Sequence, residues 1–229
     1  MVIDDTTLAR PARPGGKSTP VSRPRDAERT KATILKAARD EFSEQGFNGA
    51  RVDAIAARAK ANKRLLYHYY GNKEALYLAV LLDAYTEIRQ GEREMTLSQH
   101  DPVEGVDRMV RFTFRHFLAN PWFPRLLAVE NLQNARFLKQ IKELPALHSP
   151  LLNELRDILK RGADSGVFRT DVDPMQLYIS IAGLGYFYVS NMQTLSVIFG
   201  RDLSQFAMIQ DREAQAVQMV LDYLRTKRF

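Results

Sequence analysis

The chain has 229 residues, of which 45% are hydrophobic and 26% charged, with a formal net charge of +6 and no cysteine. This length and apolar content allow one large domain or two small ones, each with a real core. The absence of cysteine excludes disulfides, thiolate catalysis and cysteine-ligated zinc. The sequence has no run of about 18 apolar residues, so a membrane-spanning helix is not expected.

The N-terminal residues 1–26 are predicted to form a disordered basic tail. Residues 1–25 contain four prolines, two adjacent glycines and five Lys or Arg, with few large apolar groups. Such a stretch cannot bury enough surface to offset the entropy lost on ordering. It also lacks the apolar core of a signal peptide, so the cytoplasm is the expected compartment. Its last residues, 21–25, form either a plain linker or an arm that reaches into a DNA minor groove.

The excess positive charge is confined to the first third of the chain. Residues 1–75 hold 15 Lys and Arg against 9 Asp and Glu, whereas residues 76–229 hold 18 of each. This asymmetry indicates one part that meets a polyanion and another that does not, although a solvated basic surface would give the same numbers.

Residues 27–82 show the pattern of four helices. The first runs from about Ala27 to Gln45 and ends at Gly46. The second is short, with apolar groups at helical spacing at positions 52, 55, 56 and 59. After a break at 60–61, the third runs from Asn62 to about Tyr70. Asn72 caps the fourth, whose first part, 75–82, is almost wholly apolar.

The remaining residues also read as helices separated by short breaks. One helix includes residues 106–117 and ends at Asn120-Pro121. Two further helices are predicted to start at Ser149-Pro150 and at Asp173-Pro174, because a capping residue followed by proline is a helix start signal. A last helix covers about residues 204–226. No strand alternation is visible, so the predicted fold is all-α, with about nine helices.

The second and third helices form a helix-turn-helix pattern behind a basic helix. On a helical wheel at about 100° per residue, Leu66 and Tyr70 fall with Asn62 and Tyr69 on the side facing the first two helices. Arg64 and His68 fall on the opposite side, flanked by Leu65 and Tyr67. This outward strip suits a DNA major groove, where Arg reaches guanine edges and an apolar group meets a thymine methyl. Lys63 and Lys73 bracket it and suit phosphates. A solvated charged face is the alternative.

Three sequence motifs occur here in a characteristic order. They are I-L-x-A-A-x-x-x-F-x-x-x-G-F at residues 34–47, V-x-x-I-A at 52–56, and L-Y-x-[HY]-[FY]-x-x-K-E-x-L at 66–76. Residues 29–76 thereby resemble the N-terminal DNA-binding domain of the TetR family of bacterial transcriptional regulators. The resemblance implies a helix-turn-helix at about 51–70 inside a DNA-binding domain of residues 27–75. It also implies that residues 76–229 form a helical effector-binding and dimerisation domain.

The resemblance also implies roles for individual side chains. Base contacts fall to Lys63, Arg64, Leu65 and His68, base or backbone contacts to Tyr67, and phosphate contacts to Arg51, Tyr69 and Lys73. The chain departs from the family pattern at three places. Lys60 replaces the turn glycine, Asn62 replaces the Ser or Thr cap, and Ala50-Arg51 replaces a Thr-Thr pair, which removes a hydroxyl cap and adds a cation.

The second domain is expected to bind a small-molecule effector and to form a homodimer through its last two helices. Gly183 and Gly185 suit close helix crossing there, although a helix pair inside one protomer is the alternative. A core role is favoured over ligand contact for each candidate pocket residue taken singly; the candidates are Phe114, Phe117, Trp122, Phe123, Asn131, Tyr178, Tyr186 and Tyr188. Trp122 is flanked by prolines, which are typical of turns that gate cavities.

The function favoured by these observations is a regulator, most simply a repressor, that a small-molecule effector releases from an inverted-repeat operator in double-stranded DNA. One alternative is a ligand-independent DNA-binding regulator, and a cavity lined by the aromatic candidates would discriminate against it. Another is an enzyme on a helical scaffold, but no phosphate loop, nucleophile–base pair or catalytic motif is present. His116, Glu130 and His148 have no metal-site spacing, so no metal and no cofactor are expected.

Overall fold

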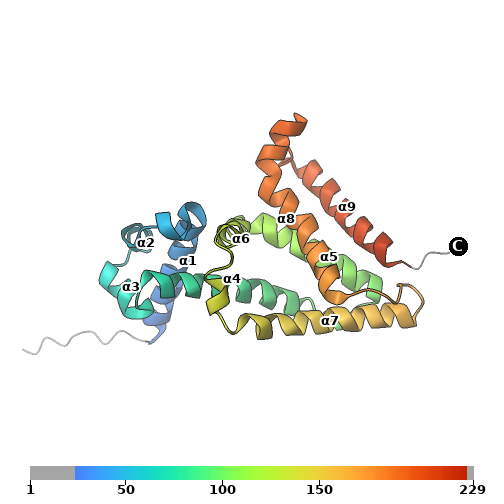
Figure 1. The fold of residues 1–229 in the computed structure, drawn as a ribbon, viewed down its shortest axis with the longest axis horizontal. Helices are drawn as coiled ribbons and strands as arrows, with labels where there is room; N and C mark the ends of the chain where they lie inside the picture. Colours follow the sequence, from blue (N-terminus) through green and yellow to red (C-terminus); the bar gives the residue numbers. More distant parts are fainter. Residues whose placement is uncertain (1–23, 226–229) are drawn as a thin grey trace, which may run out of the picture.

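The computed structural model describes residues 24–225, which form nine α-helices and two short 3-10 helices (Figure 1). The helices of the first half are α1 (Pro24–Gly49), α2 (Val52–Arg58), α3 (Lys63–Tyr70), α4 (Lys73–Glu94), η1 (Leu97–Gln99) and α5 (Pro102–Ala119). Those of the second half are α6 (Trp122–Leu132), η2 (Leu138–Gln140), α7 (Leu144–Asp164), α8 (Pro174–Phe199) and α9 (Phe206–Leu224). The all-α prediction is confirmed. Residues 1–23 of the predicted tail lie outside the described residues. Helix α1 begins at Pro24, three residues before the predicted helix start at Ala27.

Side-chain caps start the helices where the sequence predicts them. The Asn62 side chain accepts a hydrogen bond from Leu65 N at 2.8 Å, and Asn72 accepts one from Ala75 N at the same distance. Asp173 likewise accepts from Gln176 N at 2.8 Å and is followed by proline in the first turn of α8. Each carboxylate or amide oxygen satisfies a backbone N–H that has no partner inside the helix.

The predicted helix start at Ser149-Pro150 is wrong. Helix α7 begins at Leu144 with Pro145 in its first turn, so Pro150 lies inside the helix. Ser149 does not cap; its hydroxyl donates to the carbonyl of Pro145 at 2.9 Å. Pro150 has no N–H for the carbonyl four residues earlier, and α7 therefore lacks one of its internal bonds at this point.

Figure 1 shows α1–α3 gathered at one end of an elongated molecule, with α4 leading from them towards the half that holds α5, α7, α8 and α9. Helix α4 starts directly after α3 and extends into the second half of the structure. None of the described helices is long and apolar enough to cross a membrane.

The hydrophobic core is continuous between the N-terminal helices and the helices that follow them. The Tyr77 ring of α4 lies 4.8 Å from the Phe42 ring of α1 and 4.9 Å from the Phe137 ring beside η2. The buried Glu130 of α6 accepts a hydrogen bond from the Tyr77 hydroxyl at 3.0 Å. Arg39 of α1 also stacks on Trp122 of α6, so α1 packs on α6 as well as on α4.

Candidate functional site

The outward face of α3 carries the side chains that the helical wheel places there. Lys63, Arg64, Tyr67 and His68 are exposed, whereas Leu66 is buried. Tyr70 turns inward, and its hydroxyl donates to the Lys31 carbonyl of α1 at 3.0 Å. Helix α3 is therefore fixed by its inner face and presents two cations, an imidazole and a phenol to solvent.

Leu65 and Tyr69 lie at the edges of this face and are half-buried. The Lys31 ammonium stands 5.6 Å from the centre of the Tyr69 ring, within the range of a cation–π contact. Tyr69 packs against the core, which leaves its hydroxyl end as the part suited to a phosphate.

The turn between α2 and α3 has the tight geometry of a helix-turn-helix. Lys60 adopts the left-handed conformation with φ 50°, where a glycine would meet no strain. Arg51, at the start of α2, makes no side-chain cap. Its backbone N–H donates instead to the buried carboxylate of Glu41 at 3.1 Å. A carboxylate from α1 thus satisfies the N–H of the N-cap residue itself, a different donor from the one that a hydroxyl cap would bind, and the Arg51 side chain remains exposed.

Two of the predicted phosphate or base contacts are partly engaged within the protein. Lys63 forms an ion pair with Asp53 of α2 at 3.0 Å. Lys73 lies 4.9 Å from the centre of the Phe47 ring, and partial burial lowers the pKa of its ammonium. The Lys63 ammonium is thus paired with Asp53, and the Lys73 ammonium is held against the Phe47 ring.

The eight aromatic and amide candidates for the effector pocket do not converge on one site. Phe114 and Tyr188 pack together between α5 and α8, with ring centres 5.9 Å apart. The ring centres of Phe117 and Tyr186 lie 6.2 Å apart. Asn131 is exposed near the end of α6.

Trp122 is the first residue of α6 and stacks under the guanidinium of Arg39 at 4.0 Å, so it faces α1. Phe123 borders a different group of side chains, to which Tyr178 belongs.

We call this group, formed by Tyr85, Arg89, Glu92, His116, His148 and Tyr178, the buried polar cluster. Only 2% of the Arg89 surface and 2% of the Glu92 surface are exposed. Arg89 Nη2 donates to the Tyr178 hydroxyl, and Nη1 lies 2.9 Å from Glu92 Oε2. The rings of Tyr85 and His148 are 5.5 Å apart, and His116 is 5.5 Å from the bordering ring of Phe123.

Burial changes the protonation of this cluster. It raises the pKa of Glu92 to about 7, and together with the nearby Arg89 charge it lowers the pKa of His116 to about 4. The pKa of His148 is also lowered by burial. Both imidazoles are therefore neutral at neutral pH. The sequence does contain one signal of this cluster. The charged residues Arg89 and Glu92 continue the helical face of α4 on which the apolar residues Leu81 and Ile88 lie.

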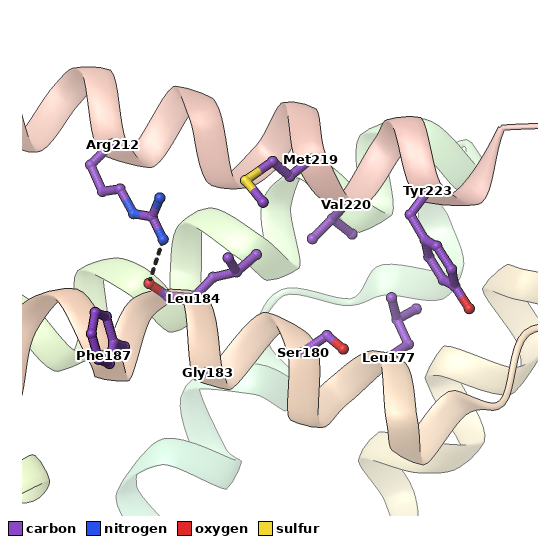
Figure 2. A pocket seen from close by; sticks show the side chains of 9 residues that line it. All are labelled: Leu177, Ser180, Gly183, Leu184, Phe187, Arg212, Met219, Val220 and Tyr223. Carbon is purple, nitrogen blue, oxygen red and sulfur yellow. Dashed lines mark hydrogen bonds between the residues drawn. The ribbon is translucent and has the colours of Figure 1, made fainter.

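A second feature is an apolar groove of about 490 Å³ between α8 and α9 (Figure 2). Side chains from both helices are directed into it, and Arg212 donates to the Leu184 carbonyl across it at 3.4 Å. Phe187, Met219 and Tyr223 line the groove and are 59%, 53% and 51% exposed. Gly183 also lines the groove, and a Cβ added there would meet no atom within 4 Å. Gly185 instead faces α5, where an added Cβ would lie 3.1 Å from the Phe117 ring. Gly185 thus serves packing inside the protomer.

Comparison with known proteins identifies two family models in the chain. Residues 34–80 match the family described as bacterial regulatory proteins, tetR family, and residues 102–220 match the tetracyclin repressor-like C-terminal domain. The chain is 37% identical over 194 residues to the HTH-type transcriptional repressor NicS of Pseudomonas putida, an alignment that covers 85% of this chain and 89% of that protein. It is 26% identical to the HTH-type transcriptional regulator RutR of Escherichia coli, over 93% and 99% of the two chains.

Among solved structures, the ketosteroid transcriptional regulator KstR2 of Mycobacterium tuberculosis aligns with a TM-score of 0.63 over 86% of this chain and 95% of that one. At 20% identity, that likeness concerns the fold.

Proposed function

Since the chain belongs to the TetR family of bacterial regulatory proteins and is a DNA-binding transcriptional regulator, we propose that it is a repressor that a small-molecule effector releases from a palindromic operator. The observation that carries this proposal is the exposed face of α3, where Lys63, Arg64, Tyr67 and His68 project from a helix fixed by its inner side. The similarity to NicS, which is named a repressor, supports the direction of regulation. A regulator of this kind acts on DNA in the cytoplasm and catalyses no reaction.

The proposed DNA-binding domain is residues 27–75, and the proposed base contacts are Lys63, Arg64, Leu65 and His68, with Tyr67 at bases or backbone. Arg51, Tyr69 and Lys73 lie around this face and would bind phosphates, which fix the register of the protein on the duplex. A two-fold dimer would place two copies of α3 in successive major grooves, about 34–36 Å apart. The operator would then be an inverted repeat.

The proposed dimer interface is the apolar face of α8 and α9. Large apolar side chains are exposed along both helices, and contiguous apolar surface of this kind is typical of a protein–protein interface. Two such helices and their two-fold mates would form a four-helix bundle. Residues 76–229 would in this way supply both dimerisation and effector binding.

We place the effector site at the buried polar cluster, which shares only Tyr178 with the eight candidates of the sequence. The packed rings of Phe114 and Phe117 favour the second candidate function, a ligand-independent regulator, because a filled core leaves no room for an effector. Arg89 and Glu92, however, are buried with polar atoms that make no hydrogen bond, which is costly unless a ligand or water completes them. The cluster therefore favours the effector-responsive regulator.

The DNA-binding part of the proposal is tested by selection from random duplex DNA with the purified protein. We expect an inverted repeat with two half-sites one helical turn apart. Arg64→Ala should change the selected sequence, while Arg201→Ala, an exposed cation between α8 and α9, should leave it unchanged. Enrichment of no sequence, or the same sequence with Arg64→Ala, would contradict the assignment of α3 to the major groove.

A further inference from the structure

The buried guanidinium of Arg89 makes fewer hydrogen bonds than a cation in the protein interior needs. The group has five N–H donors in a fixed planar fork, and it lies in the interior on α4. Its Nη2 donates to the Tyr178 hydroxyl, and its carbon lies 5.1 Å from the centre of the Tyr178 ring. The buried Nε and Nη1 atoms make no hydrogen bond in the described structure. A buried cation with unused donors is a site for an acceptor that the protein itself does not supply.

Glu92 does not fill this role. Its Oε2 is within ion-pair distance of Arg89 Nη1, but both of its carboxylate oxygens are buried without a hydrogen bond. The two groups share one helix face at a spacing of three residues, which brings their charges together without aligning donor and acceptor. The pair is thus close in space and poorly bonded.

The surroundings of Arg89 suit the body of a small planar or apolar molecule. Tyr85 and His148 stand on one side, and Phe123 with His116 stands beside them. The buried Nε2 of His116 also has no hydrogen-bond partner. A neutral imidazole can donate or accept one hydrogen bond there. The site therefore combines one strong anion-binding group, ring walls and one further polar contact.

We propose that Arg89, supported by Tyr178, binds the carboxylate of a small organic acid with a ring or short apolar body. This inference rests on the proposed effector-responsive function and names the chemical class of the effector. Arginine matches a carboxylate because its planar fork can donate two parallel hydrogen bonds. One guanidinium beside one carboxyl group balances a monoanion and not a dianion such as a phosphate ester.

The charge balance requires a proton on Glu92 when the acid is bound. The groups that face this carboxyl are Arg89 and Arg93 of α4 and Glu154 of α7, and the Tyr178 hydroxyl of α8 lies close to Arg89. Burial already brings the pKa of Glu92 to about 7, so protonation at neutral pH is easily reached. A second anion beside Arg89 would raise it further. Acid binding should therefore take up a proton and weaken as the pH rises above neutrality.

The site is closed in this structure and must open to admit a ligand. The cleft between α4 and α7 that reaches Arg89 and Glu92 has a volume of about 10 Å³, which accommodates about one water molecule. Pro150 lines that cleft at the place where α7 lacks an internal bond. An acid that enters there would part α4 from α7. Arg89 is 16 residues along α4 from Lys73, or about 24 Å from the start of the helix that follows α3.

The proposal is tested by thermal unfolding with benzoate, phenylacetate and hexanoate, each compared with its own amide. We expect at least one acid to raise the melting temperature of the full-length protein while its amide does not. The double substitution Arg89→Met/Glu92→Met removes both charges together, and replacing a buried pair in this way is generally tolerated. This variant should lose the acid response, whereas Arg201→Met, at an exposed cation between α8 and α9, should keep it.

The possible outcomes of these measurements test the binding site and the effector function separately. Equal stabilisation by acid and amide, no stabilisation by any of the acids, or an undiminished acid response in the double variant would overturn the proposal. An acid that stabilises the wild-type protein and also weakens its binding to the selected operator, with an affinity that falls from pH 6 to pH 8, would support it in full. An acid that stabilises the protein but leaves operator affinity unchanged would support the site and reject the effector function.

Discussion

Substitution of Phe187 by Asp should convert the protein from a dimer to a monomer. Phe187 lines the groove between α8 and α9, and 59% of its surface is exposed in the single chain. Full burial of a phenylalanine is worth about 1.5–3 kcal/mol, so covering the remaining surface contributes roughly 1–2 kcal/mol. A two-fold interface contains the residue twice, which doubles this to roughly 2–4 kcal/mol. The dimer dissociation constant should rise by about 30- to 700-fold, and more when the desolvation of two carboxylates is added.

The measurement is sedimentation equilibrium of the wild type and the variant at micromolar concentration. Operator binding should weaken in parallel, because a monomer holds only one half-site. The matched control is Leu132→Asp at the end of α6, where the leucine is 84% exposed but lies outside the groove. A Phe187→Asp protein that remains a dimer to the same dilution as the wild type, with its helical content intact, would refute the assignment of this face. So would a Leu132→Asp protein that dissociates.

Four further substitutions test the DNA-binding face and the buried polar cluster. Arg64→Ala should relax base preference at one half-site position by about 1–3 kcal/mol. Lys73→Ala should instead weaken binding to all DNA sequences alike and flatten the salt dependence of DNA affinity. Identical selectivity profiles for the two variants would contradict the helical-wheel assignment. Asp53→Asn should free Lys63 from its ion pair and raise DNA affinity, with a steeper dependence on salt in fluorescence anisotropy. Burial lowers the pKa of His116 from 6.5 to about 4, so the unfolded chain takes up a proton there that the folded chain does not, and stability should fall as the pH decreases from 6.5 towards 4. Urea titrations of His116→Gln should lack that part of the acid sensitivity.

The elements around α3 could be predicted from the sequence because their signals are local. Asn62 and Asn72 cap the helices they were expected to cap, and the 3.6-residue period separates buried Leu66 from exposed Arg64 and His68. The exception at Pro150 has a physical reason. A proline after serine is a start signal only when no earlier residues already form the first turn, and here Pro145 supplies that turn.

The candidate effector site could not be predicted from residue type alone. The aromatic candidates lie on α5, α6 and α8. Ring contacts join Phe117, Trp122, Phe123 and Tyr186 in one cluster, whereas Phe114 and Tyr188 pack in another and Tyr178 contacts Arg89. Arg89 and Glu92 carry no signal of burial in their residue type, because charged residues on a helix are usually solvated. The polar ends of Arg89 and Glu92 are buried because α7 and α8 pack over that face of α4. Tertiary context of this kind has no local sequence signal.

The two adjacent rings at the start of α6 connect the buried polar cluster to the N-terminal helices. Phe123 lies 5.6 Å from Tyr85 and 5.5 Å from His116, on the side of the cluster. Trp122 lies 5.7 Å from Phe123 and stacks on Arg39 of α1. A change in the cluster can therefore act on α1 through α6 as well as on α3 through α4.

Because α1 and α4 both hold α3, displacement of either would move the two recognition helices of a dimer out of register with successive major grooves. An effector that favours the displaced arrangement must by linkage bind less tightly when operator is present, typically by about 5- to 150-fold. Regulation by geometry in this manner needs no contact between effector and DNA.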